Sequence, residues 1–390
     1  MANIQDYLNW RGDLKISEAP FNRIDALILS QITYLKFDGL FPKEGFKSRM
    51  TLEELGKKFA SAPDYKERAE TGLLINSKTP EFFIHVSKTD RFKDFEITGY
   101  RSIIDLSKEE QFAAATYILP DGSNFICYRG TDDTIVGWKE DFNLALFEIP
   151  AQLDAVEYLK EAAQCLHGAL RVGGHSKGGN LAIYASFNVS KSIQNRIVRI
   201  YNNDGPGFSL EKIRSKEYRN IMDRINSYYP QYSIVGMLFN NEGKYRVVES
   251  DETGLMQHDP FSWHIMGKTF VEVKKISETS KFFHQTFNSW AAGLEEERCK
   301  KFVDTLFYVI AATDAKTNSE IQANLVKNSV KILKRLNELD PELRSMMNQV
   351  VMELFKTGIK KFPGIDVMIK SRIEELKKAS KKISSKVKKA

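Results

Sequence analysis

The spacing of hydrophobic and polar residues changes twice along the chain. Over residues 1–92 apolar side chains recur at three- and four-residue steps, as in PFNRIDALILSQITYL, which predicts a mainly helical region. Over residues 93–275 short β-prone runs such as FICY, ALRV and RIVRIY alternate with helical stretches such as DAVEYLKEAAQCL. Over residues 276–374 the helical spacing returns, and residues 375–390 form a separate basic tail. The pattern predicts a central α/β segment with a helical region on each side.

Local signals add detail to this division. Asn22 and Thr51 stand where caps of two helices are expected, and Thr51 is followed by acidic residues in the first turn. Pro120-Asp121-Gly122 lies between two β-prone runs and predicts a hairpin. Strands that alternate with helices are typical of a mostly parallel sheet covered on both faces. We therefore expect an α/β fold.

Composition and charge restrict the class of protein. The chain has 390 residues, 42% of them hydrophobic and 28% charged, which is typical of a globular protein with a large core. Three widely separated cysteines, Cys127, Cys165 and Cys299, argue against a disulfide framework and a structural zinc site. Charges near the N-terminus do not fit a signal peptide, and the most apolar run, LFYVIAA, is too short to span a bilayer. We expect a soluble, cytoplasmic protein.

The segment Gly174-His175-Ser176-Lys177-Gly178 matches the pattern G-x-S-x-G between a short apolar run and a helical stretch. A nucleophilic serine on a tight strand-to-helix turn requires this context, with very small residues two positions before and after it. The N–H of Lys177, at the start of the helix, is a candidate donor to an oxyanion. The alternative is an ordinary glycine-rich turn. A phosphate-binding loop is disfavoured because neither G-x-x-x-x-G-K-[ST] nor G-x-G-x-x-G occurs here.

A serine nucleophile needs a histidine base, and three histidines follow Ser176 in the chain. We favour His258, because its turn-rich loop directly follows the strand candidate YRVVES. A solvated loop histidine is the alternative. His264 has aromatic neighbours and is expected to pack, whereas His284 is expected on a helix. His175 is expected to be a packed residue of the turn rather than the base.

The acid that would orient the histidine is harder to identify from the sequence than the serine or the histidine. Asp204 ends the strand that follows the nucleophile's helix, which suits an orienting carboxylate, but an aspartate before Gly-Pro is also an ordinary turn residue. Asp259 is the neighbour of His258 and would have to fold back to reach it. Asp223 and Asp251 are weaker candidates. We select Asp204 and keep Asp259 as an alternative.

Four linked segments, RGTDD, GWKEDF, GHSKGGN and GLMQHDPFSW, occur in this order between Asn22 and Phe270. Together they resemble the class-3 lipase group of α/β-hydrolases, and within it a bacterial branch in which these segments recur together. The resemblance implies that Ser176 is the nucleophile and His258 the base. It also implies that Thr131 supplies the other oxyanion donor and that Trp138 and Asp141 shape its loop. It implies neither a metal nor an organic cofactor.

Two positions depart from the pattern of that group. Ser233, in QYSIVGML, stands where class-3 lipases carry the catalytic aspartate, so a hydroxyl that orients His258 is a further alternative to Asp204. Lys177 stands where lipases usually carry an apolar residue. Its charge would either depress activity on neutral lipids or favour an anionic substrate. Alternatively, the side chain would point away from the site and form a salt bridge. The sequence leaves these alternatives open.

The basic tail carries seven lysines and no acidic residue from Leu376 to Ala390. As a helix it would present an apolar stripe with lysines around it, which suits an anionic membrane surface. A solvated tail without function is the main alternative. Nucleic acid is not favoured as a partner, because no RNA-binding aromatic signature accompanies the lysines. Peripheral contact with a membrane thus remains open for a cytoplasmic protein.

The sequence as a whole predicts a serine hydrolase that acts on a carboxylic ester, with a lipid-like small molecule as substrate. A peptidase or thioesterase would use the same groups. The rival from another class is a non-catalytic protein of the same fold that binds a lipid or a protein partner, because the usual acid is missing.

Overall fold

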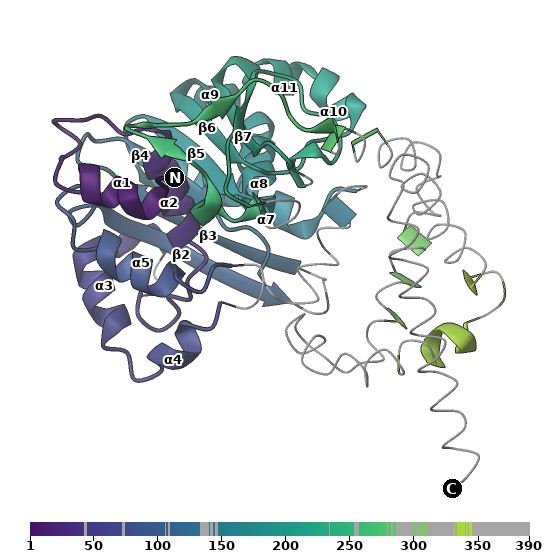
Figure 1. Ribbon diagram of the computed structural model, residues 1–390, viewed down its shortest axis with the longest axis horizontal. Coiled ribbons are helices and arrows are strands. Elements are labelled where there is room, and N and C mark those ends of the chain that lie inside the picture. Colours follow the sequence, from purple (N-terminus) through teal and green to yellow (C-terminus); the bar gives the residue numbers. More distant parts are fainter. Residues whose placement is uncertain are drawn as a thin grey trace, which may run out of the picture.

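The structure, a computed structural model, describes residues 1–42, 45–71, 75–105, 107, 110–132, 140, 143–144, 147–233, 235–252, 257–278 and scattered positions up to 344. Its centre is a nine-stranded sheet with the order β1-β2-β3-β4-β5-β6-β7-β8-β11 (Figure 1). The strands of this sheet are β1 (Arg49–Thr51), β2 (Glu96–Asp105), β3 (Glu110–Ile118), β4 (Asn124–Tyr128), β5 (Leu170–His175), β6 (Ile197–Asn203), β7 (Ile225–Pro230), β8 (Tyr245–Val248) and β11 (Glu272–Val273). A separate two-stranded ribbon consists of β9 (Ile265–Met266) and β10 (Thr269–Phe270).

The sheet is parallel in the middle and antiparallel at its edges. Strands β4 to β8 pair in parallel, whereas β1, β2 and β3 at one edge and β11 at the other join antiparallel. The predicted α/β class is confirmed. The hairpin predicted at Pro120-Asp121-Gly122 is also confirmed, since it connects β3 to β4.

Helices flank the sheet on both sides (Figure 1). They are α1 (Ile4–Arg11), α2 (Arg23–Ile32), α3 (Leu52–Ala60), α4 (Tyr65–Arg68), α5 (Thr79–Val86), α7 (Pro150–Cys165), α8 (Lys177–Asn188), α9 (Lys191–Arg196), α10 (Leu210–Arg214) and α11 (Lys216–Arg219). Short 3-10 turns occur at η1 (Gly45–Lys47), η2 (Met222–Arg224), η3 (Val235–Met237) and η5 (Pro260–Ser262). Both predicted caps are confirmed: Asn22 caps α2 and Thr51 caps α3, each in a capping box.

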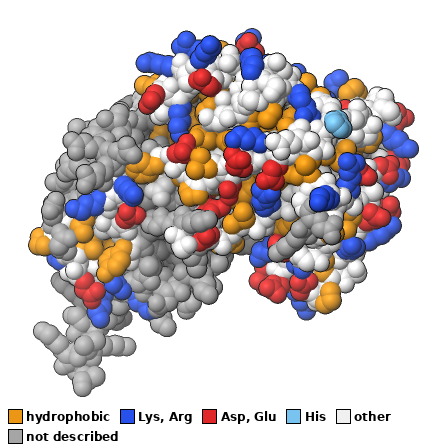
Figure 2. Space-filling view, turned by 180° about the vertical axis from the view of Figure 1, so that it is seen from behind, with side chains coloured by type: hydrophobic (Ala, Val, Ile, Leu, Met, Phe, Trp, Pro, Cys, Tyr) orange, Lys and Arg blue, Asp and Glu red, His pale blue; other side chains and the backbone are white. Residues whose placement is uncertain are grey.

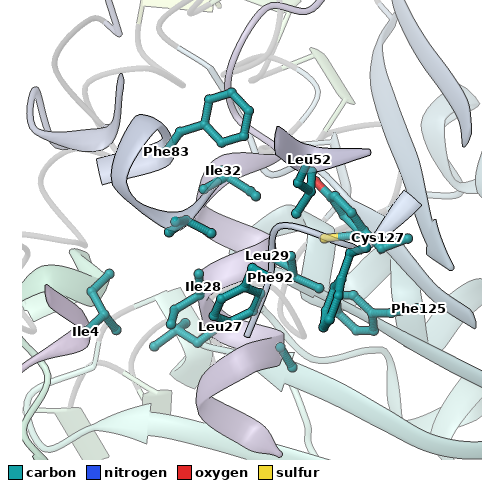
Figure 3. Close-up of a cluster of buried hydrophobic side chains, with 14 of the residues drawn as sticks. Ile4, Leu27, Ile28, Leu29, Ile32, Leu52, Phe83, Phe92, Phe125 and Cys127 are labelled. Carbon is teal, nitrogen blue, oxygen red and sulfur yellow. The ribbon is translucent and has the colours of Figure 1, made fainter. Parts of the chain in front are cut away.

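Alternate residues of β4 face two different cores. Phe125 and Cys127 pack in one hydrophobic cluster with apolar residues of α2, among them Leu29 (Figure 3). Ile126 and Tyr128 pack in a second cluster, with α7 and α8. This alternation follows from the period of two along a strand. The N-terminal helices therefore form one layer of the same sandwich, and α7 and α8 belong to the other layer.

Some of the sequence-based expectations lie outside the described residues. Trp138 and Asp141 lie outside them, as do the basic tail and most of the C-terminal region. Within the part of the chain that the structure describes, the helices are too short or too polar to cross a bilayer.

Candidate active site

The candidate site residues lie beyond the carboxyl ends of the five parallel strands. Because these strands run in one direction, the segments that follow them emerge at the same edge of the sheet, where α/β proteins place their ligand sites. The residues that follow β4, β5, β6, β7 and β8 at this edge are, in that order, Thr131, Ser176, Asp204, Ser233 and His258.

Ser176 is the single residue between a strand and a helix. β5 continues through its glycines to His175, and α8 begins at Lys177. The φ of Ser176 is 58°, a region that residues other than glycine rarely occupy and that stores strain at functional sites. A methyl group at Gly174 would lie 2.4 Å from the carbonyl carbon of Gly178, so the turn has no room for a side chain there. The strand-turn-helix geometry expected for the G-x-S-x-G segment is thus present.

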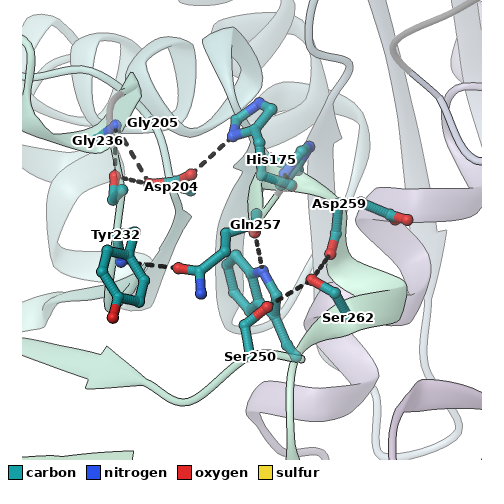
Figure 4. A network of polar contacts seen from close by, with 12 residues as sticks. His175, Asp204, Gly205, Tyr232, Gly236, Ser250, Gln257, Asp259 and Ser262 are labelled. Carbon is teal, nitrogen blue, oxygen red and sulfur yellow. Dashed lines mark hydrogen bonds and ion pairs between the residues drawn. The ribbon is translucent and has the colours of Figure 1, made fainter. Parts of the chain in front are cut away.

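His258 and Asp204 are joined by a hydrogen bond of 2.7 Å between Nδ1 and Oδ2. The Asp204 side chain is only 1% exposed, whereas that of His258 is 20% exposed. The second carboxylate oxygen, Oδ1, accepts a hydrogen bond from the Ser233 hydroxyl at 2.5 Å and one from the N–H of Gly236 at 3.2 Å (Figure 4). The structure therefore brings Asp204 to His258, and Ser233 contacts Asp204 rather than the imidazole.

The alternative acid, Asp259, points elsewhere. One of its oxygens accepts a hydrogen bond from Asn76 at 2.6 Å and the other accepts one from the N–H of Phe261, at the start of η5. Burial raises the pKa of the Asp259 carboxyl, although these two hydrogen bonds oppose the rise. Asp251 is also engaged, because its carboxylate pairs with His264 at 2.6 Å.

The main chain of His258 is held by the histidine that precedes the candidate nucleophile. His175 Nε2 lies 2.8 Å from the carbonyl oxygen of His258, which can only accept, so Nε2 carries the proton. In the neutral ring Nδ1 is then an acceptor, and the Tyr34 hydroxyl lies 2.9 Å from it. The rings of His175 and His258 are 4.4 Å apart between centroids. The expectation that His175 packs in the turn missed this polar contact, for which the sequence carries no signal.

His175 should make the folded state sensitive to acid. Burial and the nearby charge of His258 lower the pKa of His175 well below its usual value. As the pH falls below about 6.5, His175 therefore binds a proton in the unfolded chain but not in the folded chain. The free energy of unfolding falls as a result, by up to about 1.4 kcal/mol per pH unit. We expect urea denaturation at pH 7.5 and 5.5 to show a smaller decrease for His175→Gln than for the wild type. An equal decrease in both proteins would contradict a neutral His175.

Lys177 points away from the candidate site. Its ammonium group donates three hydrogen bonds, to the backbone and side-chain oxygens of Gln111 at 2.7 and 2.8 Å and to Glu140 at 2.6 Å. The side chains of Lys177 and Glu140 are each 1% exposed. Of the alternatives that the sequence left open, the structure therefore selects the salt bridge. The backbone N–H of Lys177 remains at the first position of α8, where a helix has no internal acceptor for it.

The loop of Thr131 packs against the turn of Ser176. Tyr128, at the end of β4, pairs with Gly174 of β5, and a methyl group at Gly130 would lie 2.7 Å from the carbonyl oxygen of His175. Thr131 follows directly and is buried. The two residues expected to supply oxyanion donors, Thr131 and Lys177, thus lie on adjacent segments that flank the serine.

Among the described residues, the hydroxyl of Ser176 makes no hydrogen bond with His258. Catalytic hydrogen bonds between a nucleophile and its base are often long until substrate binds. His175 nevertheless links the two residues, because it contacts His258 and directly precedes Ser176 in the chain. The arrangement places a buried carboxylate on the imidazole of His258, and the ring of that imidazole lies beside the residue that precedes Ser176.

The remaining histidines have other partners. His264 is buried, as expected, and its ring also pairs with Asp251 and Glu249. His284 lies 2.8 Å from the carbonyl oxygen of Met237 through Nδ1. Within the described ranges, His, Cys, Asp and Glu side chains do not gather in groups of three that could hold a metal ion.

Comparison with known proteins provides a family. No curated protein matches the chain. Among solved structures, the chain is similar to the lipase of Rhizomucor miehei in complex with its propeptide, with 16% identity, a TM-score of 0.33, and 54% of this chain and 81% of that chain covered. It is also similar to M37 lipase, with 13% identity, a TM-score of 0.33, and 55% and 69% covered. A model of the Mbeg1-like family matches residues 86–308, more than half of the chain, and the protein therefore belongs to the Mbeg1-like family.

Proposed function

We propose that this protein is a serine hydrolase that cleaves carboxylic esters through an acyl-enzyme on Ser176. The observation that carries the proposal is the hydrogen bond of 2.7 Å between His258 Nδ1 and the buried carboxylate of Asp204, beside the strained turn of Ser176. A buried carboxylate on Nδ1 keeps the proton on that nitrogen and leaves Nε2 free to act as a base.

In the first half of the reaction, the Ser176 oxygen attacks the carbonyl carbon of the ester while His258 Nε2 takes the hydroxyl proton. The negative charge that develops on the carbonyl oxygen is stabilised by the N–H groups of Thr131 and Lys177, which flank the serine. The bond to the alcohol then breaks, and His258 returns the proton to the departing alkoxide. Asp204 stays ionised and stabilises the imidazolium while it exists.

In the second half, His258 takes a proton from a water molecule, and the resulting hydroxide attacks the acyl-enzyme. The acid leaves when the bond to Ser176 breaks, and the serine oxygen recovers its proton from His258. The whole cycle uses groups of this chain and water. The positive charge of Lys177 does not take part, because Glu140 and Gln111 hold it away from the site.

Lipid-like esters are the substrates that we favour, on the resemblance of the linked segments to class-3 lipases. The second candidate function is a non-catalytic protein of this fold that binds a lipid or a protein partner. It is favoured by one observation, the lack of a hydrogen bond between Ser176 and His258 among the described residues.

A fluorophosphonate probe separates the two functions, because only an activated serine reacts with it. We expect the probe to label the wild-type protein at Ser176, as read by mass spectrometry of the modified peptide. Ser176→Ala should lose the label, and His258→Ala should slow labelling at least about 100-fold, the range attributed to general-base catalysis.

The matched control for the histidine is His167→Ala, which changes an exposed histidine outside the site. The probe should label this variant at Ser176 at the wild-type rate. A folded wild-type protein that does not react, or a label on another residue that persists in Ser176→Ala, would reject the hydrolase and favour the binding protein.

A further inference from the structure

A cavity of about 650 Å³ opens on the face of the sheet that the N-terminal helices cover. The segment between α1 and α2 forms one wall, the strands β6, β7 and β8 form the floor, and the turn between β9 and β10 closes one side. Its lining includes Phe21, Tyr201 and Tyr228 together with Asn22 and Asn226. The size is that of a typical small-molecule site.

This cavity is separate from the candidate active site. Two of its arginines lie near the amino ends of strands whose carboxyl ends carry candidate site residues: Arg199 is the third residue of β6, and Arg246 is the second of β8. Asp204 follows the last residue of β6, so Arg199 lies five residues before it, a span of about 16 Å along a strand. Arg199 of the cavity and the candidate acid Asp204 therefore lie toward opposite ends of β6.

The lining of the cavity is strongly basic. Its cationic residues are Arg11, Arg23, Arg199, Arg246 and Lys268, and the acidic residue among the lining residues is Glu18. Glu272 lies close by and bonds Arg246 at 2.7 Å and Arg23 at 3.4 Å, which still leaves positive charge in excess. On the face shown in Figure 2, by contrast, basic and acidic side chains are interspersed. The gathering of cations at this cavity thus differs from that mixed surface.

Three of the cations lack an ion pair within the described residues. Arg11 Nε is buried without a hydrogen-bond partner, and neither Arg199 nor Lys268 is paired with a carboxylate. Asp25, the buried acid near this end of α2, is already engaged, because it binds Arg91 at 2.5 Å and accepts a hydrogen bond from Tyr7 at 2.8 Å. Donors remain in the cavity for an anion that the protein itself does not supply.

The cavity also has an aromatic wall. Phe21 and Tyr201 stack edge to face with centroids 6.1 Å apart, and the guanidinium of Arg23 lies 5.4 Å from the centre of the Tyr228 ring. Burial raises the pKa of Tyr201 to about 12, although the positive charges of Arg171 and Arg199 oppose this rise. Both the cationic and the apolar parts of a ligand site are therefore present side by side.

We propose that this cavity binds a small organic phosphate, with its phosphate group on Arg11, Arg199 and Lys268 and its organic part against Phe21 and Tyr201. A phosphate carries up to two negative charges and accepts the paired N–H bonds that a guanidinium offers. The aromatic wall gives an organic phosphate an advantage over inorganic phosphate. The ligand is either the headgroup of a single-chain lipid or a soluble phosphate with an aromatic part, and the proposal does not depend on hydrolase activity.

Isothermal titration calorimetry of the full chain tests this proposal with inorganic phosphate, adenosine monophosphate and a short-chain lysophosphatidic acid. We expect at least one organic phosphate to bind with a Kd below about 1 mM and more tightly than inorganic phosphate. The double variant Arg199→Gln/Lys268→Gln should weaken that binding at least tenfold, because each hydrogen bond to a charged group contributes about that factor. Ser176→Ala should bind as the wild type does, which distinguishes this site from the active site.

The matched control is Arg214→Gln/Lys216→Gln, which removes the same charge from exposed positions on α10 and α11. It should leave the Kd unchanged, and the preferred organic phosphate identifies the source. The proposal fails if neither organic phosphate binds at 5 mM ligand. It also fails if both double variants weaken binding equally, which would indicate a general effect of net charge.

Discussion

Replacing Asp204 with asparagine should reduce the rate of ester hydrolysis about 10⁴-fold without unfolding the protein. The size of this effect is that seen when the orienting aspartate of a serine-histidine-aspartate triad becomes an amide. The introduced amide would be able to donate an N–H to Nδ1 of His258, which holds the imidazole in the tautomer with its proton on Nε2. In that tautomer His258 cannot accept the proton of Ser176.

Asparagine is the appropriate substitution for a reason of backbone geometry. Asp204 has a φ of 54°, in the left-handed region that aspartate and asparagine tolerate better than other residues with a side chain. Asparagine also retains an oxygen that accepts from Ser233 and the N–H of Gly236. Circular dichroism and thermal unfolding should therefore match the wild type, while turnover of a chromogenic ester reports the loss.

Two further variants make this experiment decisive. Asp259→Asn changes the carboxylate next to His258 in sequence, which faces Asn76 instead, and should leave turnover within about threefold of wild type. Ser233→Ala removes one hydrogen bond to Asp204 and should produce an intermediate loss, about tenfold. If Asp259→Asn were the variant that lost activity, Asp204 would not be the acid.

The structure places a carboxylate on His258 although Ser233 stands where the resemblance to class-3 lipases implies an aspartate. Ser233 occupies that position after β7, and Asp204 follows the neighbouring strand β6. Adjacent strands lie only about 4.8 Å apart. A carboxylate at the end of β6 is therefore close to the end of β7, and it can reach the same imidazole. The Ser233 hydroxyl donates a hydrogen bond to the carboxylate of Asp204.

Much of the fold could be predicted from the sequence, because local rules determine it. The caps Asn22 and Thr51 and the hairpin at Pro120-Asp121-Gly122 follow from side-chain hydrogen bonds and turn chemistry over a few residues. Boundaries were less accurate. The β-prone run ALRV ends at Val172, yet β5 continues through Gly173-Gly174 to His175, because the neighbouring strands β4 and β6 supply its hydrogen bonds.

The candidate site could be predicted only in part, because its contacts join distant segments. The flanking glycines indicate Ser176, and a turn-rich loop after a strand indicates His258. The sequence alone could not decide which of Asp204, Asp259 and Ser233 orients the imidazole. Their roles depend on which strand ends are neighbours, a property of the sheet order. The hydrogen bond from His175 to the main chain of His258 spans 83 positions and has no local signature.

The partner of Lys177 illustrates the same limit, because it lies far from Lys177 in the sequence. Glu140 lies within the segment GWKEDF, for which the sequence predicted roles only for Trp138 and Asp141, yet Glu140 is the residue that binds Lys177. Its carboxylate also accepts hydrogen bonds from the N–H groups of Gln111 and Ala151. The pair thus ties β3 and the start of α7 to the first turn of α8, where Ser176 is positioned.

Lys177→Met should lower the free energy of unfolding by about 3–5 kcal/mol, because it leaves the charge of Glu140 buried without a partner. Lys177→Met/Glu140→Gln should be more stable than the single variant, since the amide carries no charge and can donate to Gln111. Lys160→Met, which breaks the exposed pair with Glu157, should cost less than about 1 kcal/mol. Urea denaturation measures all three, and a double variant no more stable than Lys177→Met would show that packing rather than the buried charge determines the loss.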